Sequence, residues 1–286
     1  MDKLTLIQKE RILGNLLSSE GGRKVLAQKL QMPLRRRLDY MGVIRKAFMV
    51  DELPPGALPY YDKDPSVSAM VIPEDSTSPT PVVKGTRVAV PLKEIGVCPM
   101  IPIVQLKERR YSHMERVQDL ARQEIQAVED ESGFAAIDAA CDINTNTDIA
   151  ITGDRITRDA LTDAFAEVEK NDLRVARCFF NPRDYADIRK FGRDQIDPVH
   201  QAAIIDTGLQ AEFWGAQLIT SRIVPQGTVY ICTDGPFLGV LPIRIDLTVL
   251  PADKPWDRMV GWSIFEQVGF GVTNNNGANR LTITRT

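Results

Sequence analysis

The sequence is poor in residues that support metal-based or covalent chemistry. Its 286 residues include two histidines, His113 and His200, and four cysteines with no Cys-x-x-Cys pair among them. Zinc sites use clustered cysteine and histidine ligands, and disulfide frameworks use closely spaced cysteines, so the sequence supports neither. We expect four buried free thiols, at Cys98, Cys141, Cys178 and Cys232.

Motifs for phosphate binding and nucleophilic catalysis are also lacking. Gly269 and Gly271 match the first two glycines of a Gly-x-Gly-x-x-Gly loop, but Asn274 stands in the third place. The segment Gly261-Trp262-Ser263-Ile264-Phe265 lacks the second glycine of a hydrolase nucleophile elbow. The acidic run 129–131 is typical of a solvated helix face. We therefore predict no enzyme activity and no catalytic, cofactor-binding or metal-binding residue.

Long hydrophobic runs are absent as well. No stretch approaches the roughly 20 apolar residues of a transmembrane helix, and residues 1–4 do not begin a signal peptide. Because 43% of the residues are hydrophobic, the chain can still build a globular core. We expect it to remain in the cytoplasm where it is made, without membrane contact.

Charge is distributed unevenly along the chain. Residues 1–50 contain eleven Lys and Arg against four Asp and Glu, which leaves a net charge of −10 on the other 236 residues. The basic density peaks at Arg35-Arg36-Arg37 and continues at Arg45 and Lys46. Such a cluster can lie against phosphate groups through attraction that does not depend on base sequence. A solvated helix face, or contact with an acidic neighbouring subunit, is the alternative.

Residues 51–104 contain ten of the chain's eighteen prolines. Proline ends helices, so this segment is expected to be extended. Aliphatic residues alternate towards Pro73 and return over 83–92, with the polar stretch 74–81 between them. The pattern predicts a long hairpin that rests on another surface, because an isolated two-stranded ribbon is marginally stable. A disordered insertion is the alternative.

The remaining sequence predicts a long helix, an α/β unit and a closing sheet. Apolar residues recur every three or four positions from Ser112 to Ala140, which predicts an amphipathic helix. Residues 154–236 alternate between helical and strand patterns. After Phe237, residues 243–249 and 259–272 read as strands and 281–283 as a last one, which together predict an antiparallel sheet.

This order of parts resembles the capsid fold of tailed bacteriophages, often called Hong Kong 97-like, an α+β fold. The likeness is closest at Trp214-Gly215-Ala216-Gln217-Leu218-Ile219, at Ser221-Arg222-Ile223-Val224-Pro225, and at residues 261–272 before Asn276-Gly277. The resemblance implies an N-terminal arm at 1–50, an extended β-hairpin loop at 51–104, a peripheral domain with the spine helix at 105–148, an axial domain at 149–236, and returning peripheral strands at 237–286.

The resemblance also implies a function. Members of this family assemble through hexamers and pentamers into an icosahedral shell around double-stranded DNA, so we expect a virion capsid protein. Its expected partners are copies of itself, a separate scaffolding protein, a portal, a decoration protein and non-specifically bound DNA. Expected contacts to DNA or scaffold are Arg35, Arg36, Arg37, Arg45 and Lys46. Expected contacts between subunits are Lys63, Lys84, Asp253, Trp256, Asp257, Arg258 and Glu266.

Three further points complete the sequence-based expectations. Some relatives link subunits by a lysine–asparagine bond, but residues 250–258 contain no asparagine, so we predict no such cross-link. An encapsulin-type nanocompartment, which encloses protein cargo in a shell of the same fold, is the main alternative. A cytosolic α/β enzyme with a dimerisation hairpin is a further alternative, and it would stay small in solution.

Overall fold

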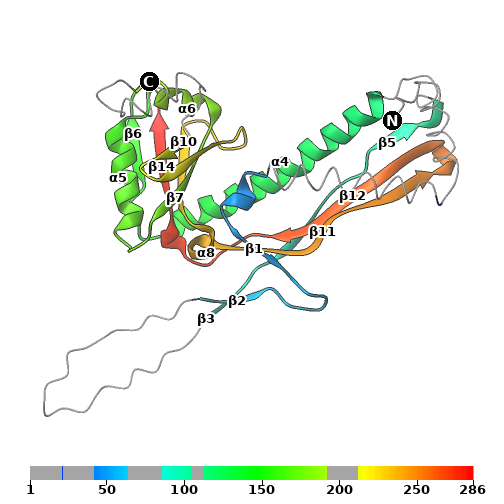
Figure 1. The fold of residues 1–286 in the computed structure, drawn as a ribbon, viewed down its shortest axis with the longest axis horizontal. Coiled ribbons are helices and arrows are strands. Elements are labelled where there is room, and N and C mark those ends of the chain that lie inside the picture. The colour runs from blue at the N-terminus through cyan, green and yellow to red at the C-terminus, as the bar shows by residue number, and fades with distance from the viewer. Residues whose placement is uncertain (1–20, 22–41, 64–85, 105–111, 192–211, 286) are drawn as a thin grey trace, which may run out of the picture.

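The computed structural model describes residue 21 and residues 42–63, 86–104, 112–191 and 212–285. Figure 1 shows a unit of sheet and helices beside a long helix, α4, that runs along a ribbon of strands. A two-stranded hairpin, β2–β3, projects from the region where these parts meet. The shape is elongated, with much of each part open to solvent.

Helix α4 (Ser112–Ile143) has 32 residues and is about 48 Å long at 1.5 Å per residue. Its buried apolar residues recur on one face at helical spacing, which turns that face towards the sheet. They include Ala121, Ile125, Phe134, Ile137 and Cys141. The long helix predicted from the sequence is therefore confirmed, and Gly133 does not interrupt it.

The peripheral sheet runs under α4 in the order β1, β11, β12, β4, with β13 beside β11 and β5 beside β12. Its strands are β1 (Met49–Glu52), β4 (Leu92–Val97), β5 (Met100–Pro102), β11 (Gly239–Lys254), β12 (Met259–Gly269) and β13 (Gly271–Val272). Strands β4 and β5 pair with β12. The predicted extended loop at 51–104 is therefore too long, because residues 92–102 belong to this sheet.

The axial unit contains a second sheet, ordered β6, β14, β10, β7, β9, β8. Its elements are β6 (Ile149–Thr152), α5 (Arg158–Glu169), β7 (Val175–Phe180), α6 (Pro182–Ile188), β8 (Glu212–Phe213), β9 (Ala216–Thr220), β10 (Thr228–Thr233) and β14 (Ala278–Thr284). Helices α5 and α6 bury Leu161 and Ile188 with Cys178 and Phe180 of β7, so both cover the same face of the sheet. Thr157 and Asn181 cap the two helices.

Strand β14 corrects the predicted domain boundary. The sequence prediction placed all of 237–286 in the peripheral domain, but β14 pairs with β10 and β6 in the axial sheet. The short helix α8 (Gly235–Leu238) leads from the axial sheet into β11, and the turn η3 (Asn275–Gly277) leads back to it. The two units also share a core, in which Phe134 of α4 meets Phe179 of β7 with ring centroids 5.4 Å apart.

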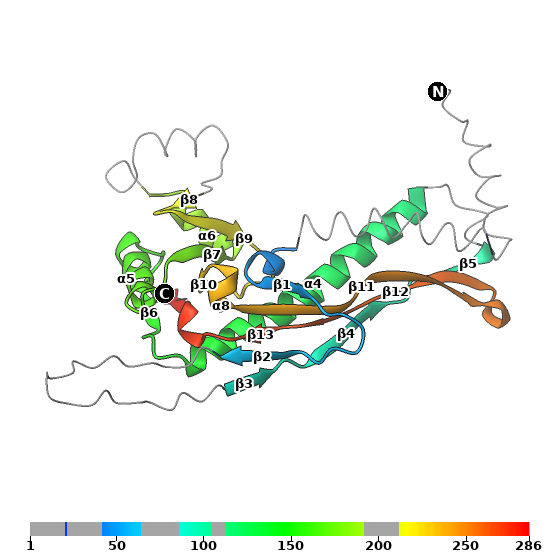
Figure 2. The ribbon, with the colours of Figure 1, turned by 60° about the horizontal axis from the view of Figure 1, so that its bottom comes forward.

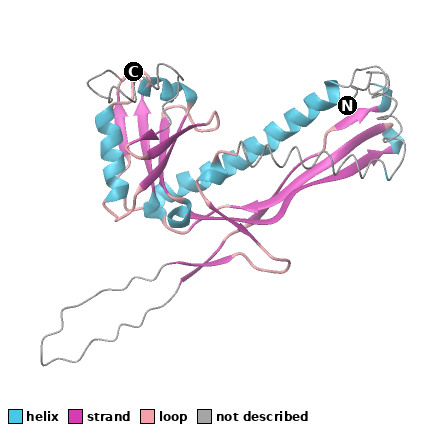
Figure 3. Cartoon of the chain, in the orientation of Figure 1, coloured by secondary structure: helices cyan, strands magenta, loops and turns pink. Residues whose placement is uncertain are grey.

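The hairpin consists of β2 (Tyr60–Lys63) and β3 (Thr86–Ala89), which pair with each other and with no other strand of the described residues. Figures 2 and 3 show β2 and β3 at the margin of the peripheral ribbon, outside both larger sheets. Just before β1, the turn η1 (Ile44–Lys46) lies on α4. The helices in the described part of the chain are all too short or too polar to span a lipid bilayer.

Candidate assembly surfaces

The far end of the peripheral ribbon carries an exposed apolar turn. The turn η2 (Pro255–Asp257) joins β11 to β12, and Arg258 closes it in a left-handed conformation with φ of 52°. Trp256 is 95% exposed. Ile103 and Val104 add exposed apolar surface, and the Ile103 amide donates a 3.0 Å hydrogen bond to the Arg258 carbonyl oxygen. A solvated indole of this size is typical of a residue that anchors a protein interface.

The charged residues that the sequence predicted at this tip surround Trp256. Asp257 and Arg258 are exposed, and Asp253 is half-buried near the end of β11. The turn therefore presents three of the predicted contact residues, Trp256, Asp257 and Arg258, and Asp253 lies on the adjoining strand β11. Their arrangement, an aromatic residue with charges at its rim, matches the usual anatomy of an interface.

The root of the hairpin is fixed, whereas its sides are open. The Tyr61 hydroxyl donates a 2.6 Å hydrogen bond to Asp51 of β1, and burial raises the pKa of this phenol above its ordinary value. Farther out, Arg87 and Asp62 form an exposed ion pair of 2.9 Å. Lys63 is exposed at the end of β2, and Lys84 lies outside the described residues.

Two predicted contact residues form an ion pair inside the chain, in which Arg45 is mostly covered and Glu266 is buried. Arg45 donates from Nε to Glu129 of α4 at 2.6 Å and from Nη2 to Glu266 of β12 at 3.1 Å. The side chain of Arg45 is 11% exposed and that of Glu266 is not exposed at all. In the single chain these two side chains pair with each other, so neither is open to the predicted contact with DNA or scaffold, for Arg45, or with another subunit, for Glu266.

The other members of the basic cluster are placed differently. Lys46 is exposed beside Arg45. Arg35, Arg36 and Arg37 lie outside the described residues.

Several carboxyl groups crowd around Arg45. Burial, followed by repulsion from Glu129, raises the pKa of Glu266 to about 8. Burial also raises the pKa of Asp130 to about 6, although this carboxyl group accepts a 3.2 Å hydrogen bond from the Ile44 amide. This cluster could not be predicted from the sequence, because Glu129 and Asp130 look like a solvated helix face and their partners are far away in the chain.

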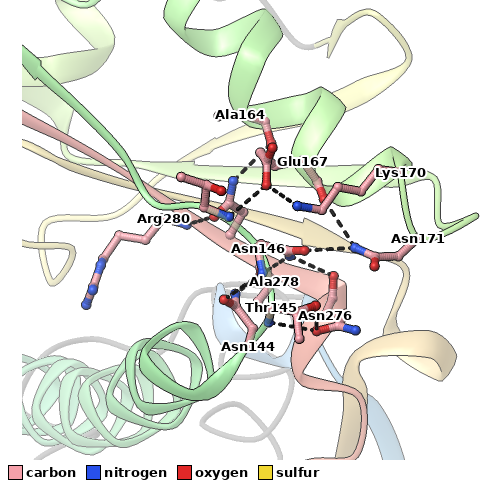
Figure 4. A network of polar contacts seen from close by, with 12 residues as sticks. Asn144, Thr145, Asn146, Ala164, Glu167, Lys170, Asn171, Asn276, Ala278 and Arg280 are labelled. Atoms are coloured by element: carbon pink, nitrogen blue, oxygen red, sulfur yellow. Dashed lines mark hydrogen bonds and ion pairs between the residues drawn. The ribbon is translucent and has the colours of Figure 1, made fainter.

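A second polar network joins the end of α4 to the axial unit (Figure 4). The side-chain amide nitrogen of Asn146 donates to the backbone carbonyl oxygens of Asn276 and Ala278, both at 3.0 Å. The side-chain oxygen of Asn146 accepts from the side-chain amide of Asn171 at 2.8 Å. The Thr145 amide and hydroxyl both donate to the side-chain oxygen of Asn276. The asparagines at 144–146 and 274–276 are visible in the sequence, but only the fold shows that these turns meet.

Arg280 of β14 strengthens the same junction. It forms ion pairs with Asp138 and Asp142 of α4 at 3.0 and 2.9 Å and with Asp148 at 2.5 Å. The hydrogen bond to Asp148, the largest of several causes, raises the pKa of Arg280, so the guanidinium remains charged.

The described residues contain no group of three or more His, Cys, Asp or Glu side chains that could hold a metal ion. Cys141, Cys178 and Cys232 are buried, as predicted, but Cys98 is exposed on the short link between β4 and β5. Burial raises the pKa of Cys141 to about 12, which makes it unreactive at neutral pH.

Comparisons with known proteins bear on the fold. No family model matches the sequence, and no curated protein matches it either. Among solved structures, a chain of Microbacterium phage Oxtober96 is 18% identical with a TM-score of 0.64, over 86% of this chain and 91% of that chain. A chain of the capsid of cyanophage P-SCSP1u is 13% identical with a TM-score of 0.66, over 86% and 89%.

A third similar structure is a virus-like particle from Pyrococcus furiosus, which is 16% identical with a TM-score of 0.59, over 89% of this chain and 98% of that one. Because the matches span most of both chains, they show that this chain has the Hong Kong 97-like capsid fold. The fold predicted from the sequence is confirmed.

Proposed function

We propose that this chain is the major capsid protein of a tailed bacteriophage, a subunit that assembles through hexamers and pentamers into an icosahedral shell around double-stranded DNA. The observation that carries the proposal is the β2–β3 hairpin, which forms a sheet of its own outside the two larger sheets. The fold is shared with chains of phage particles, including the capsid of cyanophage P-SCSP1u.

The hairpin supports assembly on energetic grounds. A two-stranded ribbon buries too little apolar surface to be stable alone, so a projecting ribbon needs a surface to pack on. Within the described chain, β2 and β3 pair with each other and no other strand. A neighbouring copy of the chain supplies that surface in a closed shell, and Lys63 then lies at the contact.

The exposed tip at η2 is the second proposed contact between subunits. Trp256 is the proposed anchor, because tryptophan buries a large apolar area and is enriched among the residues that contribute most to association. Asp253, Asp257 and Arg258 form the charged rim that selects the partner's orientation. Lys84 remains a proposed contact beyond the described residues.

The basic arm is the proposed contact with nucleic acid or scaffold. Lys46 is exposed near the point where the arm joins α4. With Arg35, Arg36 and Arg37, it provides the sequence-independent attraction that non-specific binding to packaged DNA requires. The role is structural rather than enzymatic, and a separate scaffolding protein, a portal and a decoration protein are the proposed partners in the virion.

The test is negative-stain electron microscopy of the full chain expressed alone, with size-exclusion chromatography of the same sample. Closed shells, tubes or rings of capsomers support the proposal. A stable monomer or dimer, both alone and after co-expression with a scaffolding protein, would contradict it and favour a small enzyme.

The contents of the shell separate the main proposal from the nanocompartment alternative. The structural similarity to the virus-like particle from Pyrococcus furiosus is the reason to test the nanocompartment alternative. Particles isolated from the native source are treated with nuclease and then opened. Protected DNA of uniform length supports the phage capsid, whereas a single co-purifying protein and no DNA supports the nanocompartment.

A further inference from the structure

Helix α5 presents a row of carboxylates on the face that is turned away from the axial sheet. Asp159 and Asp163 are exposed and stand four residues apart, so they are neighbours on the helix surface, where like charges repel. The next carboxylate on this face, Glu167, is paired with Lys170, whereas Asp159 and Asp163 have no ion-pair partner among the described residues. Asp159 lies in the first turn, where the helix dipole favours an acid, but Asp163 does not. Asp163 is therefore a charge that the single chain does not balance.

Helix α6 presents the opposite charge. The exposed charged residues of this helix and of the two positions after it are all basic, namely Arg183, Arg189 and Lys190. The two acidic residues of α6 are buried, and Arg285 donates from Nη2 to Asp184 at 2.6 Å and to Asp187 at 2.8 Å. Because these carboxylates are paired inside the axial unit, the outward surface of α6 is positively charged.

The cations on α6 differ in how far the chain already occupies them. Lys190 reaches the buried Asp187 at 3.3 Å, and the Arg189 guanidinium lies 5.0 Å from the centre of the Tyr185 ring. Arg183 donates a 3.4 Å hydrogen bond to the uncharged side chain of Gln226 and forms no ion pair within the described chain. Arg183 is thus the exposed cation that is most open to a carboxylate from outside.

The two charged faces lie on different sides of the axial unit. Figures 1 and 2 show α5 along the side away from α4 and α6 nearer to α4. A surface that is complementary to a different surface of the same molecule produces a head-to-tail contact, and such contacts close into rings when the rotation between copies allows it. One copy of this chain carries both halves of that contact.

We propose that the acidic face of α5, centred on Asp163, contacts the basic face of α6, centred on Arg183, of the neighbouring copy within a capsomer. The inference rests on the proposed function, because it assigns a contact inside the rings from which the shell is built. Complementary charges at such a contact fix the orientation of the partners and exclude wrong pairings.

A second copy of the chain accounts for both faces, whereas other partners account for one each. A nucleic acid or an acidic scaffold segment would satisfy α6 and leave Asp163 unpaired. A basic partner would satisfy α5 and leave Arg183 unpaired. The neighbouring copy neutralises both charges at once and needs no further molecule.

The test is charge exchange in the full chain, under the conditions in which the wild type assembles. Light scattering against protein concentration measures the assembly threshold. We expect Asp163→Lys and Arg183→Glu each to raise the threshold by about tenfold or more, because each places like charges opposite each other. The variant with both substitutions restores the opposite charges and should assemble within about threefold of the wild-type threshold.

The controls separate assembly from folding. Both residues are exposed, so each single variant should keep the wild-type unfolding temperature. Glu131→Lys reverses an exposed carboxylate on α4, away from both faces, and should keep the wild-type threshold. If a reversal does not fold, Asp163→Asn and Arg183→Gln replace it. Their combined effect on the threshold should then be smaller than the product of the two single effects, because both remove the same pair.

Wild-type thresholds for both single variants overturn this contact and leave the capsid proposal standing. So does a double variant that assembles no better than either single one, since the two residues would then face different partners. A wild type that forms no ring or shell, alone or with a scaffolding protein, overturns this contact together with the proposed function.

Discussion

At the scale of single residues, Arg280 is a polar link between the spine helix and the axial sheet. It contacts three carboxylates, and its own side chain is 21% exposed. Hydrogen bonds to charged groups contribute about 1.5–3 kcal/mol each when buried, but partial exposure and salt reduce this. We expect Arg280→Ala to lower the free energy of unfolding by about 2 kcal/mol.

Urea denaturation measures this change. Arg87→Ala is the control, because the Arg87–Asp62 pair is 74% and 72% exposed and should contribute less than about 0.5 kcal/mol. Equal effects of the two substitutions would show that the Arg280 network does not stabilise the junction.

Gly133 makes room for η1 on the spine helix. A Cβ atom added there would lie 2.1 Å from Cγ1 of Ile44, so Ile44 would have to move. Overpacking of this kind costs about 1–3 kcal/mol, whereas alanine gains roughly 0.5–1 kcal/mol in a helix interior. We expect Gly133→Ala to destabilise the chain by a net amount of about 1 kcal/mol.

Thermal unfolding compares Gly133→Ala with Gly153→Ala, a position where an added Cβ meets nothing within 4 Å. The control should unfold at the wild-type temperature. A Gly133→Ala variant with raised thermal stability would mean that Ile44 is not confined at this site.

At the scale of elements, the η2 tip tests the assembly proposal without disturbing the fold. Trp256 is 95% exposed, so Trp256→Ala should leave the unfolding temperature of the subunit unchanged. We expect the same variant to weaken assembly about tenfold or more, because hot-spot residues cost at least 2 kcal/mol when truncated. Light scattering against protein concentration gives the assembly threshold.

Trp256→Phe is the companion variant and should restore part of the assembly, since it retains an aromatic anchor. Wild-type assembly by Trp256→Ala would remove this turn from the contacts between subunits.

The elements also show what the sequence could predict. Local periodicity was sufficient for α4, α5 and β11, since each has its apolar residues at one spacing over many positions. It was insufficient for β4 and β14. The sheet that each strand joins is decided by a partner strand far away in the chain, β12 for β4 and β10 for β14. Trp256 could be predicted as exposed because the turn that holds it is formed by neighbouring residues. The Arg45–Glu266 pair could not be predicted, because these residues are 221 positions apart in the chain.

At the scale of the whole molecule, the described strands differ in how many neighbouring strands they have and in how many of their residues are buried. Strands β7 and β10 are central in the axial sheet, with neighbours on both sides and buried residues throughout. Strands β2 and β3 have one neighbour each and are mostly exposed. The free energy of local opening is low where a segment has few apolar contacts and many exposed backbone hydrogen bonds. The isolated subunit should therefore open first at the hairpin.

Assembly should remove this difference if the hairpin packs on a neighbouring copy. Hydrogen exchange of the amides at 60–63 and 86–89 should slow by about tenfold or more between isolated subunits and shells, because each opening would then break contacts between subunits. The amides of β7 and β10 should exchange slowly in both states, since their protection comes from within the chain. Equal, fast exchange of the hairpin in both states would mean that it remains free in the shell, and the contact that closes the shell would then have to come from the η2 tip.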